Sequence, residues 1–328
     1  ISDLQNYLNG ATRKGNNPFY SWRVGADLKN SVMNAVYLNG PSLGLGKDYY
    51  QKVNEANTKT LAEYTGFATK LYQALGYKNA GNTASQLVKF EKELANYLLT
   101  NEQGRDANLR YNPKNVSELP ALVKNINLPA YLKSAGVATD RVIIGELKYY
   151  QNMDSFINSR NLPLLKDYMK FHLLRGNMGN LDKKMDDLQF DFYSKYLQGQ
   201  QEQRPMDKRG LQMINSVLGE AFGKLYVEEN FSPEAKAQME TYINYLRKAF
   251  SARIDQLDWM SPETKVKAQE KLSKFNVKIA YPDQWRDYSK LVVESPKSGG
   301  TLYQNMENLT AWHYQRNLAK IGHPVDKK

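Results

Sequence analysis

Apolar residues recur at every third or fourth position along most of the chain, which is the period of an amphipathic α-helix. The period is clearest over 232–260. Ser232 suits a helix N-cap there, and Pro233 suits the first helical position, where its missing N–H costs no hydrogen bond. Because Ser261 and Pro262 repeat this start, we predict a second helix from there to about position 275.

The same period predicts further helices, separated by segments rich in Asn, Gly and Pro. They span 48–75, 83–99, 140–156, 162–197 (which could break near 176–179), 207–228 and 302–319. Loops are predicted at 77–82, 112–115 and 294–300, and a linker or exposed turn at 198–205.

The sequence contains few signals of β-strands. Residues 32–38 are partly β-branched or apolar and end at Asn39-Gly40-Pro41, which predicts a short strand or hairpin arm. The predicted fold class is therefore mainly α: a large elongated helical lobe with minor short strands. With 328 residues the chain is long enough for two domains. We predict two helical parts, 1–204 and 205–328.

Composition favours a globular fold and argues against a membrane span, a nucleic-acid partner and disulfide bonds. Hydrophobic residues make up 41% of the chain, and its apolar runs are far shorter than a membrane span. The net charge is +11, but the lysines are dispersed, so we interpret them as solvated helix faces and expect no nucleic-acid partner. No cysteine is present, which excludes disulfides and thiolate sites.

Several sequence blocks occur in an order that is similar to one known family. The main blocks are LGLGKDYY at 43–50, RD at 105–106, YNP at 111–113, LGEAFGKLYVEENFS at 218–232, LDWMSPETKVKAQEKL at 257–272, YPDQWRDY at 281–288 and QRNLAKIGHPVD at 315–326. They resemble the amino-terminal, non-catalytic region of the neprilysin and endothelin-converting enzyme family of zinc metalloendopeptidases, in its bacterial oligoendopeptidase branch. Gly46 and Lys47 stand where the family usually has Pro and Arg.

The resemblance implies a function for a larger parent protein. In the family this region forms a lid-like lobe that encloses and size-selects peptide substrates over a catalytic lobe. The zinc ligands lie in a later H-E-x-x-H helix and a further glutamate, and no His-Glu pair occurs here. The expected partners are that catalytic lobe and peptide substrates. We expect zinc in the parent enzyme but no cofactor in this chain, which should be inactive alone.

Two other expectations follow. Export to the periplasm or cell surface is favoured over a cytoplasmic location. The alternative function is a stand-alone helical binding or scaffold protein derived from the same lobe.

No residue of the chain is assigned a catalytic, cofactor-binding or metal-binding role. A zinc-peptidase helix needs two histidines four positions apart. His172, His313 and His323 lack that spacing, and we interpret His172 as a buried or half-buried packing residue.

Carboxylates, glycines and aromatic residues also receive structural interpretations. Glu220 and the pair Glu228 and Glu229 flank the best family block, and carboxylate pairs can do acid–base work. Glu228 and Glu229 end a predicted helix, so they are expected to be surface charges or loop anchors instead. Neither Gly44-x-Gly46 nor the pair Gly219 and Gly223 has the Lys-Ser/Thr of a phosphate loop, and the second pair suggests close helix packing. Trp285 and Tyr288 are three positions apart and are expected to share a face packed into a core.

Overall fold

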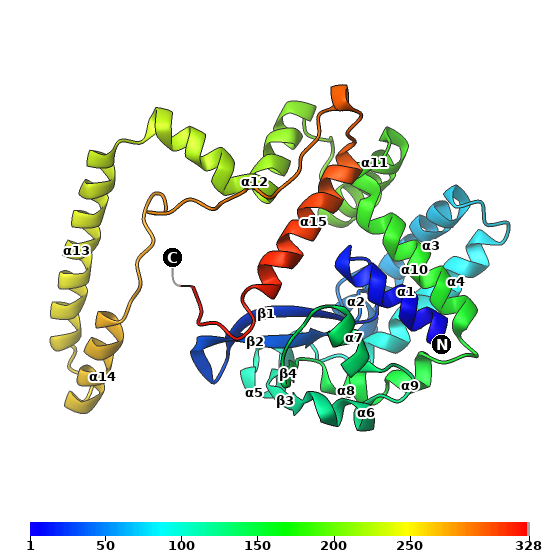
Figure 1. Cartoon of the computed structure of the whole chain (residues 1–328), viewed down its shortest axis with the longest axis horizontal. Coiled ribbons are helices and arrows are strands. Elements are labelled where there is room, and N and C mark those ends of the chain that lie inside the picture. Colours follow the sequence, from blue (N-terminus) through cyan, green and yellow to red (C-terminus); the bar gives the residue numbers. More distant parts are fainter. Residues whose placement is uncertain (327–328) are drawn as a thin grey trace. The chain divides into compact units, whose positions relative to one another are not determined.

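Fifteen α-helices and a four-stranded sheet are formed by residues 1–326, the part of the chain that the computed structural model describes (Figure 1). The mainly α prediction is confirmed. The chain folds as two units: unit 1 comprises 1–203 and 291–325, and unit 2 comprises 204–290 with residue 326. The functional division at 204 stays a prediction.

The sheet of unit 1 has the order β1-β2-β4-β3. Its strands are β1 (Ser21–Asp27), β2 (Asn30–Asn39), β3 (Asn112–Asn115) and β4 (Arg141–Ile144). β1 and β2 form an antiparallel hairpin, β4 runs parallel to β2, and β3 runs antiparallel to β4. The strand predicted over 32–38 is thus confirmed as part of β2.

Helices from distant parts of the sequence build the rest of unit 1. The longer ones are α1 (Ser2–Arg13), α3 (Glu55–Ala74), α4 (Ala80–Ala95), α10 (Leu162–Asn177) and α15 (Leu302–Leu318). The shorter ones are α2 (Asp48–Gln51), α5 (Ala107–Arg110), α6 (Leu119–Leu122), α7 (Leu128–Ser134), α8 (Leu147–Gln151), α9 (Met153–Phe156) and α11 (Lys183–Gln189). α15 follows unit 2 in sequence yet packs on α1 and β1, so unit 1 is closed by both ends of the described chain.

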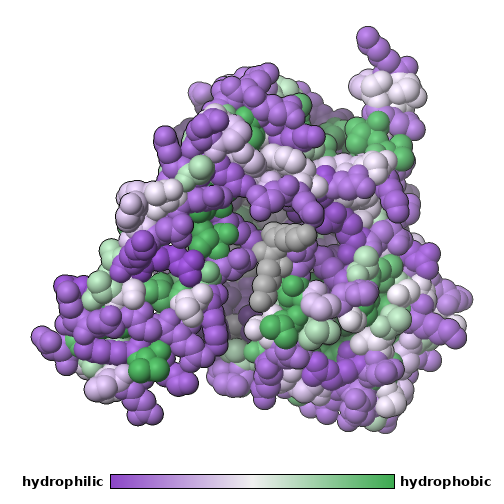
Figure 2. Space-filling view, turned by 60° about the vertical axis from the view of Figure 1, so that its left-hand side comes forward, coloured by the Kyte–Doolittle hydropathy of each residue, from purple (hydrophilic) through white to green (hydrophobic). Residues whose placement is uncertain are grey.

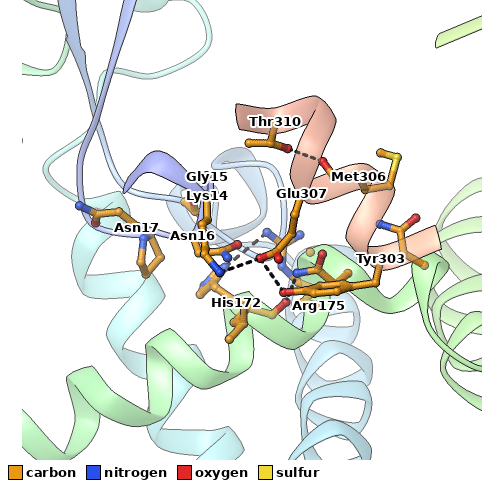
Figure 3. A pocket seen from close by; sticks show the side chains of 16 residues that line it. Lys14, Gly15, Asn16, Asn17, His172, Arg175, Tyr303, Met306, Glu307 and Thr310 are labelled. Atoms are coloured by element: carbon orange, nitrogen blue, oxygen red, sulfur yellow. Dashed lines mark hydrogen bonds and ion pairs between the residues drawn. The ribbon is translucent and has the colours of Figure 1, made fainter. Parts of the chain in front are cut away.

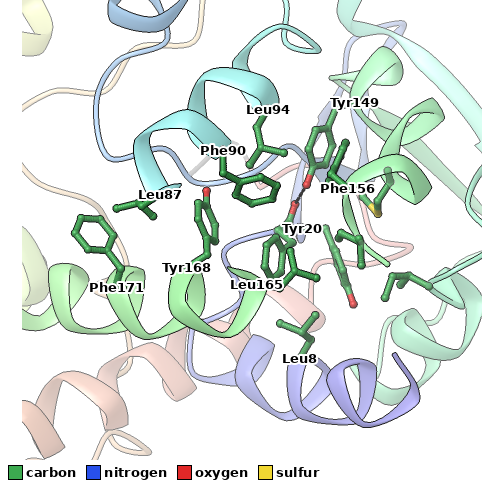
Figure 4. Close-up of a cluster of buried hydrophobic side chains, with 14 of the residues drawn as sticks. Leu8, Tyr20, Leu87, Phe90, Leu94, Tyr149, Phe156, Leu165, Tyr168 and Phe171 are labelled. Atoms are coloured by element: carbon green, nitrogen blue, oxygen red, sulfur yellow. Dashed lines mark hydrogen bonds between the residues drawn. The ribbon is translucent and has the colours of Figure 1, made fainter. Parts of the chain in front are cut away.

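Large aromatic and aliphatic side chains fill the core of unit 1 (Figure 4). Phe90 of α4 meets Tyr168 of α10 edge-on at a centroid distance of 5.3 Å, and Tyr149 of α8 lies 5.1 Å from Phe156. The hydroxyl of Tyr149 donates to the carbonyl of Phe19 at 2.8 Å, so this buried phenol keeps a hydrogen bond. The core therefore fixes α4 and α10 side by side.

Two predicted elements are of the wrong type, and the helix predicted over 48–75 is divided into α2 and α3. Residues 140–156 do not form one helix, because Val142, Ile143 and Ile144 are fully buried in β4 before α8 and α9 begin. β-Branched residues pack well on a pleated sheet, and here that preference overrides the helical period. The loop predicted at 112–115 is the edge strand β3, where Pro113 is tolerated because an edge strand leaves some N–H groups unpaired.

Unit 2 consists mainly of three helices, α12 (Met206–Asn230), α13 (Pro233–Asp255) and α14 (Pro262–Ser273). Both predicted N-caps are confirmed: Ser232 accepts from the N–H of Ala235, and Ser261 accepts from that of Thr264, each at 3.2 Å. α13 and α14 are joined by polar contacts, such as the 2.9 Å bond from Gln269 to the carbonyl of Ser251. Among the described residues of unit 2, Ile254 alone belongs to the buried apolar set.

Candidate functional site

A buried carboxyl group lies at the centre of unit 1. Glu91 of α4 has no exposed surface, and its two oxygens accept hydrogen bonds from four donors. These are the N–H of Gly44 at 2.8 Å, the hydroxyls of Tyr50 at 2.7 Å and Tyr64 at 3.2 Å, and Nε2 of His172 at 3.1 Å. Four converging donors are the environment of an acceptor-only carboxylate, whose burial is otherwise costly.

The Glu91 cluster holds the LGLGKDYY turn against α4 and α10. Besides the Gly44 N–H, the turn offers the N–H of Leu45, which donates to the Tyr50 hydroxyl at 3.1 Å. The carbonyl of Gly44 accepts from Tyr193 at 2.9 Å. Gly44 therefore bonds through both its backbone groups, which explains this part of the motif as structural.

His172 connects the cluster to the solvent side of α10. Its Nδ1 faces a guanidinium nitrogen of Arg175 at 3.3 Å, while Nε2 faces Glu91. Because Arg175 can only donate, Nδ1 must accept, which assigns the proton to Nε2 of a neutral imidazole. Burial lowers the pKa of His172 below its ordinary 6.5, and the charge of Arg175 lowers it further, although Glu91 opposes both.

His172 and Arg175 also line a polar pocket of about 280 Å³ (Figure 3). The turn after α1 contributes Lys14 and Asn16, and the first turns of α15 contribute Tyr303 and Glu307. The Glu307 carboxylate accepts from Lys14 at 3.2 Å and from the Tyr303 hydroxyl at 3.1 Å. Three segments far apart in sequence thus present charged groups to one small space.

The neutral buried histidine should make stability depend on pH. In the unfolded chain His172 regains its ordinary pKa and binds a proton at a higher pH than in the folded chain. Its contribution is therefore fully present above about pH 6.5 and is lost as the pH falls through that value towards the lowered folded pKa. The slope from one such group approaches about 1.4 kcal/mol per pH unit.

Urea unfolding at about pH 7.5 and about pH 5.5 measures this dependence. We expect His172→Gln to lose less free energy of unfolding than the parent between the two values, because glutamine does not titrate. An equal loss in both proteins would show that His172 is not the group responsible.

The three histidines are not brought together. His172 is buried on α10, His313 is exposed on α15, and the carbonyl of His323 accepts from the Asn34 side chain at 2.9 Å. Within residues 1–326, no group of three His, Cys, Asp or Glu side chains is placed to hold a metal ion. The expectation that His172 is buried is confirmed, but it is a hydrogen-bonding residue as well as a packing one.

The surface position expected for Glu228 and Glu229 is confirmed. Glu228 and Glu229 are exposed near the end of α12. Glu220 is a loop anchor: its carboxylate pairs with the guanidinium of Arg286 at 2.5 Å and accepts from the Arg286 backbone N–H at 3.0 Å.

Two interpretations for unit 2 are wrong. A Cβ atom at Gly219 or Gly223 would meet nothing within 4 Å, so no close helix packing occurs there in the described residues. Trp285 and Tyr288 lie in an irregular segment and are half-buried, so three-residue spacing does not place them on one helical face. Trp285 instead stacks on Tyr281 at a centroid distance of 6.0 Å.

Glu91 and Arg175 were not identified from the sequence. The pattern offered one indication: Glu91 falls on the apolar stripe of α4, between the buried residues Leu87 and Leu94. A charged residue at such a position is rarely buried unless it is paired.

Comparison with known proteins identifies the family. A model of the amino-terminal part of peptidase family M13 matches residues 1–282. The chain belongs to peptidase family M13. It is 26% identical to neprilysin-11 of Caenorhabditis elegans, over 98% of this chain and 40% of the relative. It is 27% identical to a neutral endopeptidase of Lactococcus lactis, over 94% and 49%. The resemblance to neprilysins is thus confirmed.

Solved structures agree with this assignment. The zinc metalloprotease Zmp1 of Mycobacterium tuberculosis, in complex with an inhibitor, superposes with a TM-score of 0.87 at 28% identity. The match covers 99% of this M13 chain and 49% of that protein. Its open state gives a TM-score of 0.85 at 30% identity. The chain therefore spans about half the length of the relatives it matches.

Proposed function

We propose that this M13 chain is the non-catalytic amino-terminal region of a zinc-dependent metalloendopeptidase. Its role would be to enclose peptide substrates over the catalytic lobe and to select them by size. The proposal is supported by relatives about twice as long, one of which is described as a zinc metalloprotease.

The observation that carries the proposal is the incomplete packing of unit 2. Along α13, several large apolar side chains are exposed to between 43% and 65%: Met239, Tyr242, Tyr245, Leu246 and Phe250. Figure 2 shows hydrophobic groups on a largely hydrophilic face of the molecule. Helices with exposed apolar side chains and almost no core of their own usually pack against a further element. We infer that the catalytic lobe supplies it.

Enclosure would act on the reaction without making or breaking bonds. A lobe closed over an active site excludes water and strengthens the electrostatic interactions inside it. It also admits short peptides and rejects proteins that are too large to enter, and its opening limits substrate exchange. Among residues 1–326, no helix combines the length and apolar character needed to cross a bilayer.

The isolated 328-residue chain should not perform the chemistry. We expect no stoichiometric zinc by metal analysis after dialysis and no cleavage of a quenched fluorescent peptide. Cleavage that is abolished by EDTA and restored by zinc would contradict the assignment of a non-catalytic role.

Size selection is tested on the complete parent protein. We expect it to cleave peptides of about ten residues at least ~100-fold faster than an unfolded protein of more than ~100 residues, because only the former enter an enclosed site. Disulfide-free α-casein is a suitable long substrate, because it has no stable fold that would resist cleavage. Equal rates per susceptible bond would contradict the enclosing role while leaving the family assignment intact.

The alternative of a stand-alone helical scaffold makes a different prediction. The reading frame downstream of Lys328 distinguishes the two: the peptidase proposal expects an H-E-x-x-H sequence there, and an immediate stop codon favours the scaffold. The exposed side chains of α13 would then bind a separate protein.

A further inference from the structure

The polar pocket of unit 1 combines both signs of charge with several amides. Its positive side is the Arg175 guanidinium, which is bonded to Nδ1 of His172 and the Tyr193 hydroxyl and also interacts with the charge of the buried Glu91 carboxylate. Nε of Arg175 is buried without a hydrogen-bond partner. Because Nε has almost no accessible surface, a ligand in the pocket would have to accept from the terminal nitrogens of the guanidinium.

The negative side is Glu307. Its side chain is only 19% exposed and is held in place by Lys14 and Tyr303 (Figure 3). Such a carboxylate can accept further hydrogen bonds, because two oxygens offer about four acceptor positions. Because Lys14 already pairs with Glu307, a ligand ammonium group would have to displace the largely exposed Lys14 side chain from this carboxylate.

The remaining polar lining suits a peptide group. Asn16, Asn17, Asn177 and Asn180 all line the pocket. The amide of Asn17 is already bonded to Thr12, Phe19 and Tyr20, and that of Asn177 donates to the carbonyl of Leu173. Asn16 and Asn180 are therefore the amides that can offer both a donor and an acceptor to a peptide bond. A volume of about 280 Å³ lies at the lower end of the range for small-molecule sites and is too small for a long peptide.

We propose that this pocket binds a small zwitterion, a free amino acid or a dipeptide with both termini free. Arg175 takes the carboxylate, and Glu307 takes the ammonium group. Nothing in the proposal depends on the enclosing function, because every residue of the pocket belongs to unit 1.

Calorimetric titration of the 328-residue chain with L-alanyl-L-alanine tests this. We expect saturable binding that weakens about tenfold or more for the N-acetylated dipeptide and for the dipeptide amide, since each lacks one charge. No binding at about 10 mM dialanine would overturn the proposal. Inorganic phosphate that binds as tightly as dialanine would also overturn it, in favour of a simple anion site.

Two variants test which residue binds the carboxylate of the ligand and which binds its ammonium group. Arg175→Gln should bind dialanine no better than the parent binds the dipeptide amide. Glu307→Gln should bind it no better than the parent binds the N-acetylated form, while keeping the parent's affinity for that form, which shows that the pocket is intact. Lys70→Gln removes an exposed charge on α3 and should change nothing. Unchanged dialanine affinity in Glu307→Gln would refute the zwitterion.

Discussion

Replacing Glu91 by alanine should destabilise unit 1 by about 3–5 kcal/mol, because each buried donor left without an acceptor costs about 1–3 kcal/mol. The substitution leaves the N–H of Gly44, two tyrosine hydroxyls and Nε2 of His172 without their acceptor in a place that water does not reach. For a unit of this size the midpoint of thermal unfolding should fall by about 10 °C.

Differential scanning calorimetry measures this effect, and Glu93→Ala is the matched control. Glu93 lies on the same helix but is exposed, so its replacement should shift the midpoint by no more than about 1–2 °C. Equal shifts in the two variants would mean that the Glu91 hydrogen bonds add nothing to stability. The variant Glu91→Gln removes the charge but keeps the shape of the side chain. Its unfolding midpoint should lie between those of Glu91→Ala and Glu93→Ala, because an amide keeps one acceptor oxygen.

The helices could be predicted where local chemistry alone decides them. α13 and α14 begin at Ser-Pro pairs, and both caps form as expected because a serine side chain and the backbone N–H three positions later are neighbours in sequence. β4 could not be predicted in this way. Its pairing with β2 joins residues about a hundred positions apart, and a single sequence carries no information on such partners.

The candidate site was even harder to predict, because its residues are also distant from one another in the sequence. Glu91, His172 and Gly44 come from three separate segments, and only the packing of α4 against α10 and the turn makes them neighbours. The family blocks identified the relatives correctly, but they marked the turn at 43–50 without indicating its buried partner. In unit 2 the open space beside Gly219 and Gly223 contradicts the expected close packing, because the four-residue spacing of two glycines does not show that a second helix lies beside them.

Gly44→Ala should be nearly as damaging, although it adds a single methyl group. A Cβ atom at Gly44 would overlap the hydroxyl and ring of Tyr64, which is itself fully buried and bonded to Glu91. The ring cannot move aside without breaking that bond or displacing the aromatic core. Overpacking of this kind costs about 1–3 kcal/mol, and the rigid surroundings place this site at the upper end.

Gly46→Ala is the control, because it lies two positions away in the same turn. Its Cβ would lie 3.8 Å from the nearest atom of Tyr49, an ordinary van der Waals contact. Chemical denaturation should therefore give a free energy of unfolding lower by about 3 kcal/mol for Gly44→Ala and nearly unchanged for Gly46→Ala. The double variant Gly44→Ala with Tyr64→Phe should recover part of the loss, since it removes the hydroxyl nearest the new methyl group. If it recovers nothing, the damage comes from the turn itself rather than from contact with Tyr64.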